Sequence, residues 1–458
     1  MEEEHINIEL LIKNQYEFFK SGVTRDIEKR REQLLKLKET IIKYEKEIEE
    51  SVYLDLGKSS AETYLSEIKF VLSEIDFSIK NIKKWAKRQC VPTSLMVYPS
   101  RSSIVYEPYG VVLIIAPFNY PFQLLIAPLI GAIAAGNCAI VKPSHLTINT
   151  GKILEKIISE IFPERYIAVV NGGPSVVNEL LKNKFDYIFF TGGEKFGREV
   201  AIAAAKNLTP YTLELGGKSP CIVFDADNLN LCAKRIVWGK FLNAGQTCIA
   251  PDYILVKKEQ KNELIKYLKV NIQNFFGSNP QLNKYYPRLI TENTVERLSH
   301  LMYSSGEIIF GGDINIKEKF ISPTLIDEPS VESDIMKEEI FGPILPIIGV
   351  ESLEEAVEFI NNREKPLAIY FFGNSKDSKK IIDKTSSGGV CINDTIMHII
   401  NPNLPFGGIG NSGIGVYHGE YSFLAFSHKK PCMKRYLYFD IAFRYPPFKI
   451  PKWIEKFL

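Results

Sequence analysis

A cysteine at the end of the stretch NAGQTC, residues 243–248, is the first residue whose type and setting suggest chemistry. Cys248 follows small and polar residues, whereas Cys138 and Cys391 lie inside apolar runs that are typical of buried strands. A cysteine becomes a nucleophile when a base or a positive field favours its thiolate, and the neighbouring sequence contains no histidine. The residues alone leave two interpretations open, a small buried side chain or a nucleophile that faces a cleft.

Two charged residues lie in otherwise apolar segments. Glu214, in TLELGGK (212–218), would have a raised pKa if it were desolvated there, which suits a general base. The alternative for Glu214 is an ion pair, for example with Lys218. Lys142, in IVKPS (140–144), could bind a ribose or a phosphate at the carboxyl edge of a parallel sheet. The alternative for Lys142 is a solvated lysine at the end of a strand.

Two glycine patterns could bind a dinucleotide. The textual fingerprint G-x-G-x-x-G occurs at residues 408–413, but it follows a loop-like segment instead of a strand and has no acidic residue about 20 positions on, so we treat it as a chance match. In FFTGGEKFG (189–197), a β-rich run ends at Gly192 and we expect a helix from about Phe196, with Gly197 in its first turn. A glycine turn that leads into a helix offers backbone N–H groups to a pyrophosphate. The second pattern is the better candidate.

These residues must be positioned by an α/β fold with a mainly parallel sheet. From Gly110 onward, short β-branched runs alternate with helical segments, and a second series of the same kind follows Cys248. Residues 110–141 are apolar, but prolines and polar residues interrupt them, so we expect strand, turn, buried helix and strand instead of a membrane span. Residues 8–88 have helical periodicity and predict packing helices without chemistry. Their expected apolar stripe contains Leu34, Leu35, Leu37, Ile41 and Ile42.

Composition narrows the class of protein. A chain of 458 residues predicts two or three domains, and 56 basic against 54 acidic residues argue against a nucleic-acid partner. Seven cysteines without paired spacing and six scattered histidines predict a reducing compartment, no disulfide framework and no metal site. The acidic start MEEEHINIEL predicts no export signal, and we expect a cytoplasmic protein. The basic and aromatic segment 441–458 could rest weakly on a membrane surface.

Taken in order, the motifs resemble the aldehyde dehydrogenase superfamily, and in particular its class 3 branch of fatty and aromatic aldehyde dehydrogenases. The resemblance extends from the N-terminal helices to about residue 447. It is carried by APFNYPF (116–122), IVKPS (140–144), FFTGGEKFG (189–197), LTPYTLELGGKSPC (208–221), NAGQTC (243–248), KEEIFGPILPI (337–347), and NDTIMH (393–398) followed by LPFGGIGNSGIGVYHGEYSFLAFSH (404–428).

The resemblance implies oxidation of an aldehyde to a carboxylate with NAD or NADP. Cys248 is then the nucleophile, Asn119 holds the oxyanion together with the Cys248 backbone N–H, and Glu214 activates the water that hydrolyses the thioester. The resemblance also assigns six cofactor-binding residues: Lys142 at the adenosine ribose, His145 beside it, Gly192 and Gly197 at the pyrophosphate, Glu339 at the nicotinamide ribose and Phe341 at the nicotinamide ring.

One residue departs from the family pattern. His145 stands where the family usually has an acidic residue that binds the ribose hydroxyls. Without that carboxylate, Lys142 and His145 could attract a 2′-phosphate, so we expect NADP to be tolerated beside NAD, unless His145 points to solvent.

By the same resemblance, the aldehyde pocket contains Tyr120, Ile396, Ile399 and Ile400. These residues are mostly apolar, which favours medium to long aliphatic or aromatic aldehydes over charged semialdehydes.

The implied architecture is a Rossmann-like NAD(P)-binding domain (1–85 and 110–215), an α/β catalytic domain (216–415), and a small β bridging or oligomerisation element with the C-terminal tail (86–109 and 416–458). Class 3 relatives are generally homodimers whose bridging strands extend the partner's sheet, and residues 102–110 and 434–443 have the alternation of such strands. Two alternatives remain: an acyl-transferring enzyme, which would need no deacylating base, and a non-catalytic protein on the same scaffold. Glu214 counts against the first, and the presence of Cys248, Asn119 and Glu214 together counts against the second.

Overall fold

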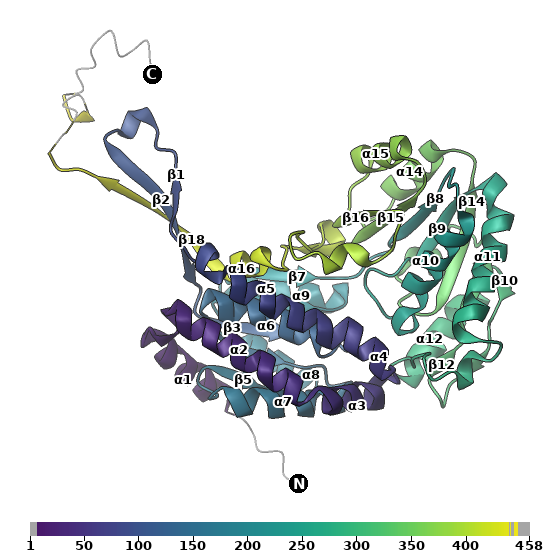
Figure 1. Cartoon of the computed structure of the whole chain (residues 1–458), viewed down its shortest axis with the longest axis horizontal. Coiled ribbons are helices and arrows are strands. Elements are labelled where there is room, and N and C mark those ends of the chain that lie inside the picture. Colours follow the sequence, from purple (N-terminus) through teal and green to yellow (C-terminus); the bar gives the residue numbers. More distant parts are fainter. Residues whose placement is uncertain (1–6, 439, 441–443, 448–458) are drawn as a thin grey trace.

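The computed structural model describes residues 7–438, 440 and 444–447. They form two α/β lobes and a long three-stranded sheet that projects away from the first lobe (Figure 1). The segment expected to contact lipid, 441–458, lies outside the described residues apart from 444–447. Among the described residues, no helix has the length and apolarity needed to cross a membrane.

The first lobe is built on a six-stranded sheet in the order β17-β7-β6-β3-β4-β5. Its strands are parallel except at the edge, where β17 runs antiparallel to β7. The chain winds outward from β3 in both directions, so the strand order reverses between β3 and β6, and a crevice is expected at their carboxyl ends. The strands are β3 (Val111–Ile115), β4 (Cys138–Lys142), β5 (Ile167–Val169), β6 (Tyr187–Thr191), β7 (Tyr211–Glu214) and β17 (Gly413–Ile414).

Helix α6 (Gln123–Ala135) lies between β3 and β4, and every one of its residues is buried. A helix that is apolar all round belongs inside a protein, and this confirms the expected strand, turn, buried helix and strand over residues 110–141. The other crossover helices of this lobe are α7 (Ile148–Ile161), α8 (Pro174–Lys182) and α9 (Glu194–Lys206).

The N-terminal helices pack on the first lobe (Figure 1). They are α1 (Ile8–Lys20), α2 (Ile27–Lys43), α3 (Glu45–Leu56), α4 (Ser60–Thr63), a five-residue π-helix (Tyr64–Ile68) and α5 (Lys69–Trp85). The expected stripe of α2 is only partly correct. Leu34, Leu37 and Ile41 are fully buried, but Leu35 and Ile42 are 46% and 50% exposed, because residues one step along a helix point about 100° away from the buried face.

The second lobe is built on a seven-stranded sheet in the order β10-β13-β14-β9-β8-β15-β16, parallel except for β10. The apolar runs expected as strands after Cys248, at residues 253–258, 345–350, 368–373 and 389–394, correspond to β9, β14, β15 and β16 of this sheet. Its strands are β8 (Pro220–Val223), β9 (Tyr253–Lys257), β10 (Glu307–Phe310), β13 (Thr324–Asp327), β14 (Ile344–Val350), β15 (Ala368–Phe372) and β16 (Gly389–Ile392). Its helices are α10 (Leu229–Phe241), α11 (Lys258–Phe276), α12 (Glu292–Tyr303), α13 (Asp334–Lys337), α14 (Leu353–Asn361) and α15 (Ser375–Lys384), and a small hairpin joins β11 (Ile314–Asn315) to β12 (Phe320–Ile321).

The projecting sheet consists of β1 (Gln89–Val91), β2 (Ser100–Pro108) and β18 (Ser427–Arg435). Strand β2 matches the expected strand at 102–110, but β18 lies earlier than the expected strand at 434–443. Most residues of β18 are exposed on both faces, so it lacks the apolar alternation that marks a half-buried strand. Its position is fixed instead by a nine-residue antiparallel ladder with β2.

The chain returns to the first lobe before it enters β18. Strand β17 pairs with β7, and helix α16 (Glu420–Ala425) packs on α6, where a Cβ added at Gly131 would lie 2.8 Å from the Ser422 side chain. Residues 413–425 therefore belong to the first lobe. The sequence-based division assigned them to the catalytic domain and the bridging element, because so short a strand and helix carry no sequence signal for the sheet that they join.

Candidate active site

A cavity of about 510 Å³ opens where the strand order of the first lobe reverses, at the carboxyl ends of β3 and β6. Residues of the second lobe, Cys248, Glu339 and Phe341, also line this cavity. Eight of the nine catalytic and cofactor residues expected from the sequence line this one cavity: Asn119, Lys142, His145, Gly192, Glu214, Cys248, Glu339 and Phe341.

The loop that carries Cys248 is a strained turn held by hydrogen bonds. After α10, Asn243, Ala244 and Gly245 have φ values of 51°, 52° and 76°, which L residues rarely adopt. The Asn243 side chain donates to the Asn119 backbone carbonyl at 2.7 Å, and its backbone N–H donates to Glu62 at 2.8 Å. At Gly245 a Cβ would overlap the Gly342 carbonyl. The turn delivers Cys248 to the cavity wall, partly exposed, so it is not an ordinary core cysteine.

The Asn119 side chain reaches the same loop from the end of β3. Its amide nitrogen donates to the Gln246 carbonyl at 3.0 Å, and the residue is only 3% exposed. A primary amide carries two N–H groups, so this bond fixes the amide and leaves one donor free.

Glu214 lies at the end of β7, is 2% exposed, and has no hydrogen-bond partner on either carboxylate oxygen among the described residues. Burial raises its pKa well above the usual value. The ion pair with Lys218 that we considered does not form, because Lys218 binds Asp252 at 2.5 Å instead. Glu214 is therefore a desolvated carboxyl group facing the cavity.

The charges around Cys248 favour its neutral thiol. Burial raises the pKa of the thiol, and the Glu339 and Glu214 carboxylates raise it further. Ionisation of Cys248 therefore requires a compensating positive charge or removal of the proton during the reaction.

The opposite end of the cavity is suited to a dinucleotide. Lys142 is 1% exposed and donates to the Pro143 carbonyl at 2.6 Å, so it is not the solvated lysine of our alternative, and burial lowers its pKa to about 8. His145 is exposed beside it, and burial and Lys142 both lower its pKa.

The turn before α9 leaves the start of that helix open. Helix α9 begins at Glu194, two residues before the expected start, and its N-cap, Gly193, supplies no side chain. A Cβ added at Gly193 would meet nothing within 4 Å. The Thr191 hydroxyl close by has no hydrogen-bond partner among the described residues. The cavity thus has three features that fit the phosphates and ribose of NAD(P): a free helix N-terminus, an unpaired hydroxyl and a buried ammonium.

Gly197 has a different role from the one we expected. It does not line the cavity, and a Cβ at this position would lie 2.6 Å from the Leu215 side chain. Gly197 therefore lets α9 approach the end of β7 closely, which is a packing role.

Glu339 and Phe341 come from the segment that precedes β14. The Glu339 carboxylate lies so close to Gly216 that any Cβ there would overlap it. The Phe341 ring packs edge-on against Phe118 with centroids 5.8 Å apart. Burial raises the pKa of Glu339 to about 8, Asp252 raises it, and the Gly217 N–H, Lys218 and Lys240 lower it.

The sequence did not reveal a buried polar network behind the catalytic loop. Lys58 and Glu67 form an ion pair at 2.6 Å with both side chains fully buried. The Lys58 ammonium also donates to the Asn119 carbonyl at 2.9 Å and lies 4.0 Å from the centre of the Tyr120 ring. Glu67 accepts from the Phe122 N–H at 2.9 Å. The N-terminal helices, which we expected only to pack, therefore hold the oxyanion donor and the catalytic loop. Nothing in the sequence indicated this role, because Lys58 and Glu67 are nine residues apart and form no recognisable motif.

The four residues expected to form the aldehyde pocket do not line this cavity. The Tyr120 hydroxyl is 2.7 Å from the Thr247 hydroxyl, Ile396 is buried, Ile399 is half-buried and Ile400 is 55% exposed. Their role in binding an aldehyde stays a prediction.

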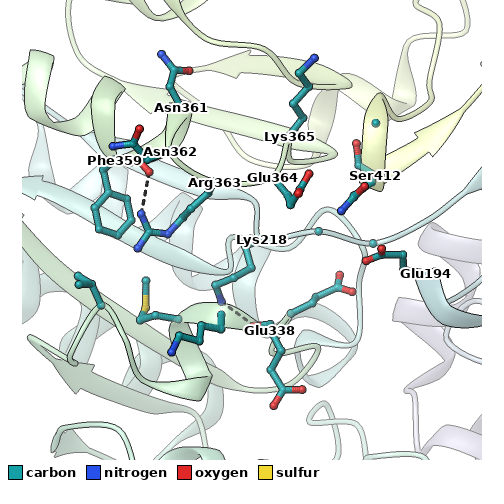
Figure 2. A pocket seen from close by; sticks show the side chains of 18 of the residues that line it. Glu194, Lys218, Glu338, Phe359, Asn361, Asn362, Arg363, Glu364, Lys365 and Ser412 are labelled. Atoms are coloured by element: carbon teal, nitrogen blue, oxygen red, sulfur yellow. Dashed lines mark hydrogen bonds between the residues drawn. The ribbon is translucent and has the colours of Figure 1, made fainter.

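A second, larger cleft of about 1310 Å³ shares Gly216 and Glu339 with the first. Charged side chains line most of it, including Lys218, whose ammonium donates to the Glu338 carbonyl at 2.9 Å (Figure 2). In the described part of the chain, no group of three or more His, Cys, Asp or Glu residues could hold a metal ion.

Comparison with known proteins identifies the fold and the family. The model of the aldehyde dehydrogenase family matches residues 4–431. The chain belongs to the aldehyde dehydrogenase family. A solved structure of the Staphylococcus aureus enzyme AldH in a substrate-bound state superimposes with a TM-score of 0.95 at 46% identity, covering 98% of this chain and 99% of that one.

Curated aldehyde dehydrogenases match nearly the whole chain. A Staphylococcus aureus 4,4′-diaponeurosporen-aldehyde dehydrogenase is 48% identical over 94% of this chain and 95% of its own length. The mouse aldehyde dehydrogenase family 3 member A2 is 45% identical, with coverages of 96% and 92%. A mouse aldehyde dehydrogenase named dimeric and NADP-preferring is 44% identical, with coverages of 96% and 98%. The resemblance to class 3 aldehyde dehydrogenases is therefore confirmed, together with NAD(P)-dependent aldehyde oxidation.

Proposed function

We propose that this aldehyde dehydrogenase oxidises medium to long apolar aldehydes, aliphatic or aromatic, to carboxylates through a thioester on Cys248. The observation that carries the proposal is the meeting of Cys248, Asn119 and Glu214 in one cavity whose other end fits a dinucleotide. These three side chains supply a nucleophile, an oxyanion donor and a base.

In the first half of the reaction, the Cys248 sulfur attacks the aldehyde carbon and the carbonyl π electrons move to oxygen. The free N–H of the Asn119 amide and the Cys248 backbone N–H hold the resulting oxyanion. The bond from Asn119 to the Gln246 carbonyl orients the amide before substrate arrives, so no reorganisation is needed during the reaction.

When bound, the cofactor would supply a hydride acceptor for the former aldehyde carbon and a positive charge that favours the Cys248 thiolate. Glu339 would accept hydrogen bonds from the nicotinamide ribose, and Phe341 would restrict the space beside Cys248. Lys142 and the open N-terminus of α9 would bind the adenosine ribose and the pyrophosphate.

In the second half, Glu214 removes a proton from water, and the oxygen attacks the thioester carbonyl. The C–S bond breaks, the acyl group leaves as a carboxylate, and the thiolate returns to Cys248. The raised pKa of Glu214 makes it a stronger base than an exposed carboxylate, because its charged form is poorly solvated.

The substrate class rests on the character of the catalytic end of the cavity. Phe118, Leu124 and Phe341 line it, and the basic lining residues, Lys142 and His145, belong to the other end. A charged aldehyde would lose hydration there without a compensating partner. A relative named for 4,4′-diaponeurosporen-aldehyde supports the same class.

We extend the proposal to the use of both NAD and NADP. In the described cavity wall the acidic residues are Glu214 and Glu339, both at the catalytic end, so a 2′-phosphate near Lys142 and His145 meets no lining carboxylate.

We also propose a homodimer formed through the projecting sheet. Its outer strands β1 and β18 each have an unpaired edge, and so does the half-buried strand β16 at the margin of the second lobe. Exposed strand edges pair readily with other chains, and the name of the dimeric mouse relative supports this. Equilibrium sedimentation of the intact chain would show a mass near 104 kDa, twice the 52.0 kDa of one chain, and a monomer at micromolar concentration would contradict it.

A cytoplasmic location and weak lipid contact through residues 441–458 complete the proposal. The seven cysteines, all free in the structure, support the location. Sedimentation with anionic vesicles, before and after removal of residues 448–458, tests the lipid contact.

The direct test of activity follows the absorbance of the reduced nicotinamide with purified protein, decanal, and NAD or NADP. We expect decanal-dependent reduction with both cofactors, formation of decanoate, and loss of the signal in Cys248→Ser. Higher kcat/KM for succinic semialdehyde than for decanal would contradict the substrate class.

A further inference from the structure

Lys240 is a fully buried lysine to which the reaction assigns no role. It is the second-last residue of α10, eight residues before Cys248, and its side chain is 0% exposed. Its ammonium has no hydrogen-bond partner among the described residues. Because an unpartnered buried charge destabilises a fold, a lysine here needs an explanation other than stability.

The charged groups nearest to Lys240 belong to the machinery around Glu339. One oxygen of Asp252 lies 4.0 Å from the Lys240 ammonium. Burial lowers the pKa of Lys240 to about 8. The charge of Lys218 also lowers this pKa, whereas the charges of Asp252 and Glu339 raise it. Lys240 therefore lies beside Asp252, and it does not line the cavity itself.

Asp252 connects Lys240 to the backbone on both sides of Glu339. The Asp252 oxygen that faces Lys240 accepts from the Ile340 N–H at 3.2 Å, and the other oxygen pairs with Lys218 at 2.5 Å. Lys218 in turn donates to the Ile335 and Glu338 carbonyls at 2.7 and 2.9 Å, the latter drawn in Figure 2. One carboxylate thus links both lysines to residues 335–340.

The balance of charge explains why two lysines are needed. Asp252 and Glu339 carry two negative charges when both are ionised, and Lys218 neutralises only one of them. Without the Lys240 ammonium, the cluster would hold a net negative charge in a buried setting, which favours protonation of Glu339.

We infer that Lys240 is a positioning residue for the cofactor: through Asp252, which accepts from the Ile340 N–H, it holds the 335–340 segment and Glu339 in place to bind the nicotinamide ribose. This inference rests on the proposed function of the cavity. It predicts that Lys240 sets the affinity for NAD(P) and leaves the chemical steps at Cys248 unchanged.

The test replaces Lys240 by methionine, which has similar length and no charge, and measures NADH binding by fluorescence titration. We expect the Kd for NADH and the KM for NAD to rise about tenfold, as for the loss of a hydrogen bond to a charged group. We expect kcat at saturating cofactor to stay within about twofold. The Tm is measured beside the Kd, because the substitution removes a buried ammonium and leaves Lys218 as the remaining cation at Asp252. The matched control is Lys234→Met, at an exposed position of the same helix, with the wild-type Kd.

A Kd for Lys240→Met within twofold of the wild-type value overturns the inference, whatever the Tm. A purely structural role gives that result together with a lower Tm. If Lys240→Met does not fold, Asp252→Asn tests the same link, and an unchanged Kd for NADH in that variant also overturns it. Failure of the wild-type protein to bind NADH would instead contradict the proposed function.

Discussion

The Lys58 ammonium donates to the backbone carbonyl of Asn119 at 2.9 Å, which ties the N-terminal helices to the residue that carries the oxyanion donor. Lys58 and its partner Glu67 are both fully buried. The Asn119 carbonyl also accepts from the Asn243 side chain of the catalytic loop at 2.7 Å. Two lobes of the molecule therefore meet on one carbonyl group, immediately behind the site of reaction.

The first prediction concerns the stability that this ion pair controls. Lys58→Met leaves the Glu67 carboxylate buried without its cation, so the free energy of unfolding in urea should fall by about 3 to 5 kcal/mol. The double variant Lys58→Met/Glu67→Gln removes both charges and should regain part of that loss. The exposed Lys69, close by in sequence, provides the control Lys69→Met, which should change stability by less than about 0.5 kcal/mol. A loss below about 1 kcal/mol for Lys58→Met would show that the pair is not needed for the fold.

The second prediction concerns the oxyanion donor. Asn119→Ala should lower kcat for decanal several hundred-fold, about 3 kcal/mol of barrier, because the donor acts on charge that develops in the transition state. The Kd for NADH should stay the same, since Asn119 is assigned no contact with the cofactor. Asn171→Ala, at an exposed position, serves as the control. A fall in kcat of less than tenfold would remove Asn119 from this role.

The third prediction concerns the choice between NAD and NADP. His145→Glu places a carboxylate near Lys142, where it would repel a 2′-phosphate, so kcat/KM for NADP should fall by about tenfold or more with little change for NAD. The wild-type protein should prefer NAD by less than about 100-fold. A stronger wild-type preference for NAD, or equal effects of His145→Glu on both cofactors, would mean that His145 points away from the cofactor.

The fourth prediction concerns stability in acid. His418 is buried and His398 is half-buried, and burial lowers the pKa of the former to about 3 and of the latter to about 4. Both therefore stay neutral in the folded protein while the unfolded chain takes up protons below about pH 6.5, so stability is lost as the pH falls. Between pH 7 and 5.5, each histidine should account for about 1.3 kcal/mol of the loss in unfolding free energy.

His418→Gln should therefore show a smaller loss of stability over this pH range than the wild-type protein, whatever its stability at pH 7. Urea unfolding at the two pH values measures the difference. His300→Gln is the control, because His300 is exposed and should leave the pH dependence unchanged. Equal pH dependence in His418→Gln and the wild-type protein would show that His418 is protonated in the folded state.

The sequence predicted those site residues that lie in motifs resembling the motifs of the aldehyde dehydrogenase family and occurring in the same order. Cys248, Glu214, Lys142 and Glu339 lie in segments whose local pattern is distinctive, and the structure brings them to one cavity. Most strands of both sheets were predicted for a related reason, since buried parallel strands are apolar runs bounded by turn residues.

The remaining features depend on contacts between segments that are far apart in the chain. Lys58 and Lys240 are the same residue type as many exposed lysines of this chain, and only the folded structure shows that they are buried. Strand β18 has no apolar alternation, so its position is set by its ladder with β2, more than 300 residues earlier. Gly197 matched a cofactor pattern but serves close packing against Leu215. Local pattern cannot reveal partners of this kind.

The measurement that tests the account most directly is intact-protein mass spectrometry of Glu214→Gln after reaction with decanal and NAD. The variant retains Cys248 and Asn119 but lacks the base for hydrolysis. We predict one equivalent of reduced nicotinamide and a decanoyl adduct that peptide mapping places on Cys248 and that hydroxylamine releases. An adduct on another residue, or steady turnover at the wild-type rate without an adduct, would contradict the central claim that Cys248 carries the acyl group and Glu214 discharges it.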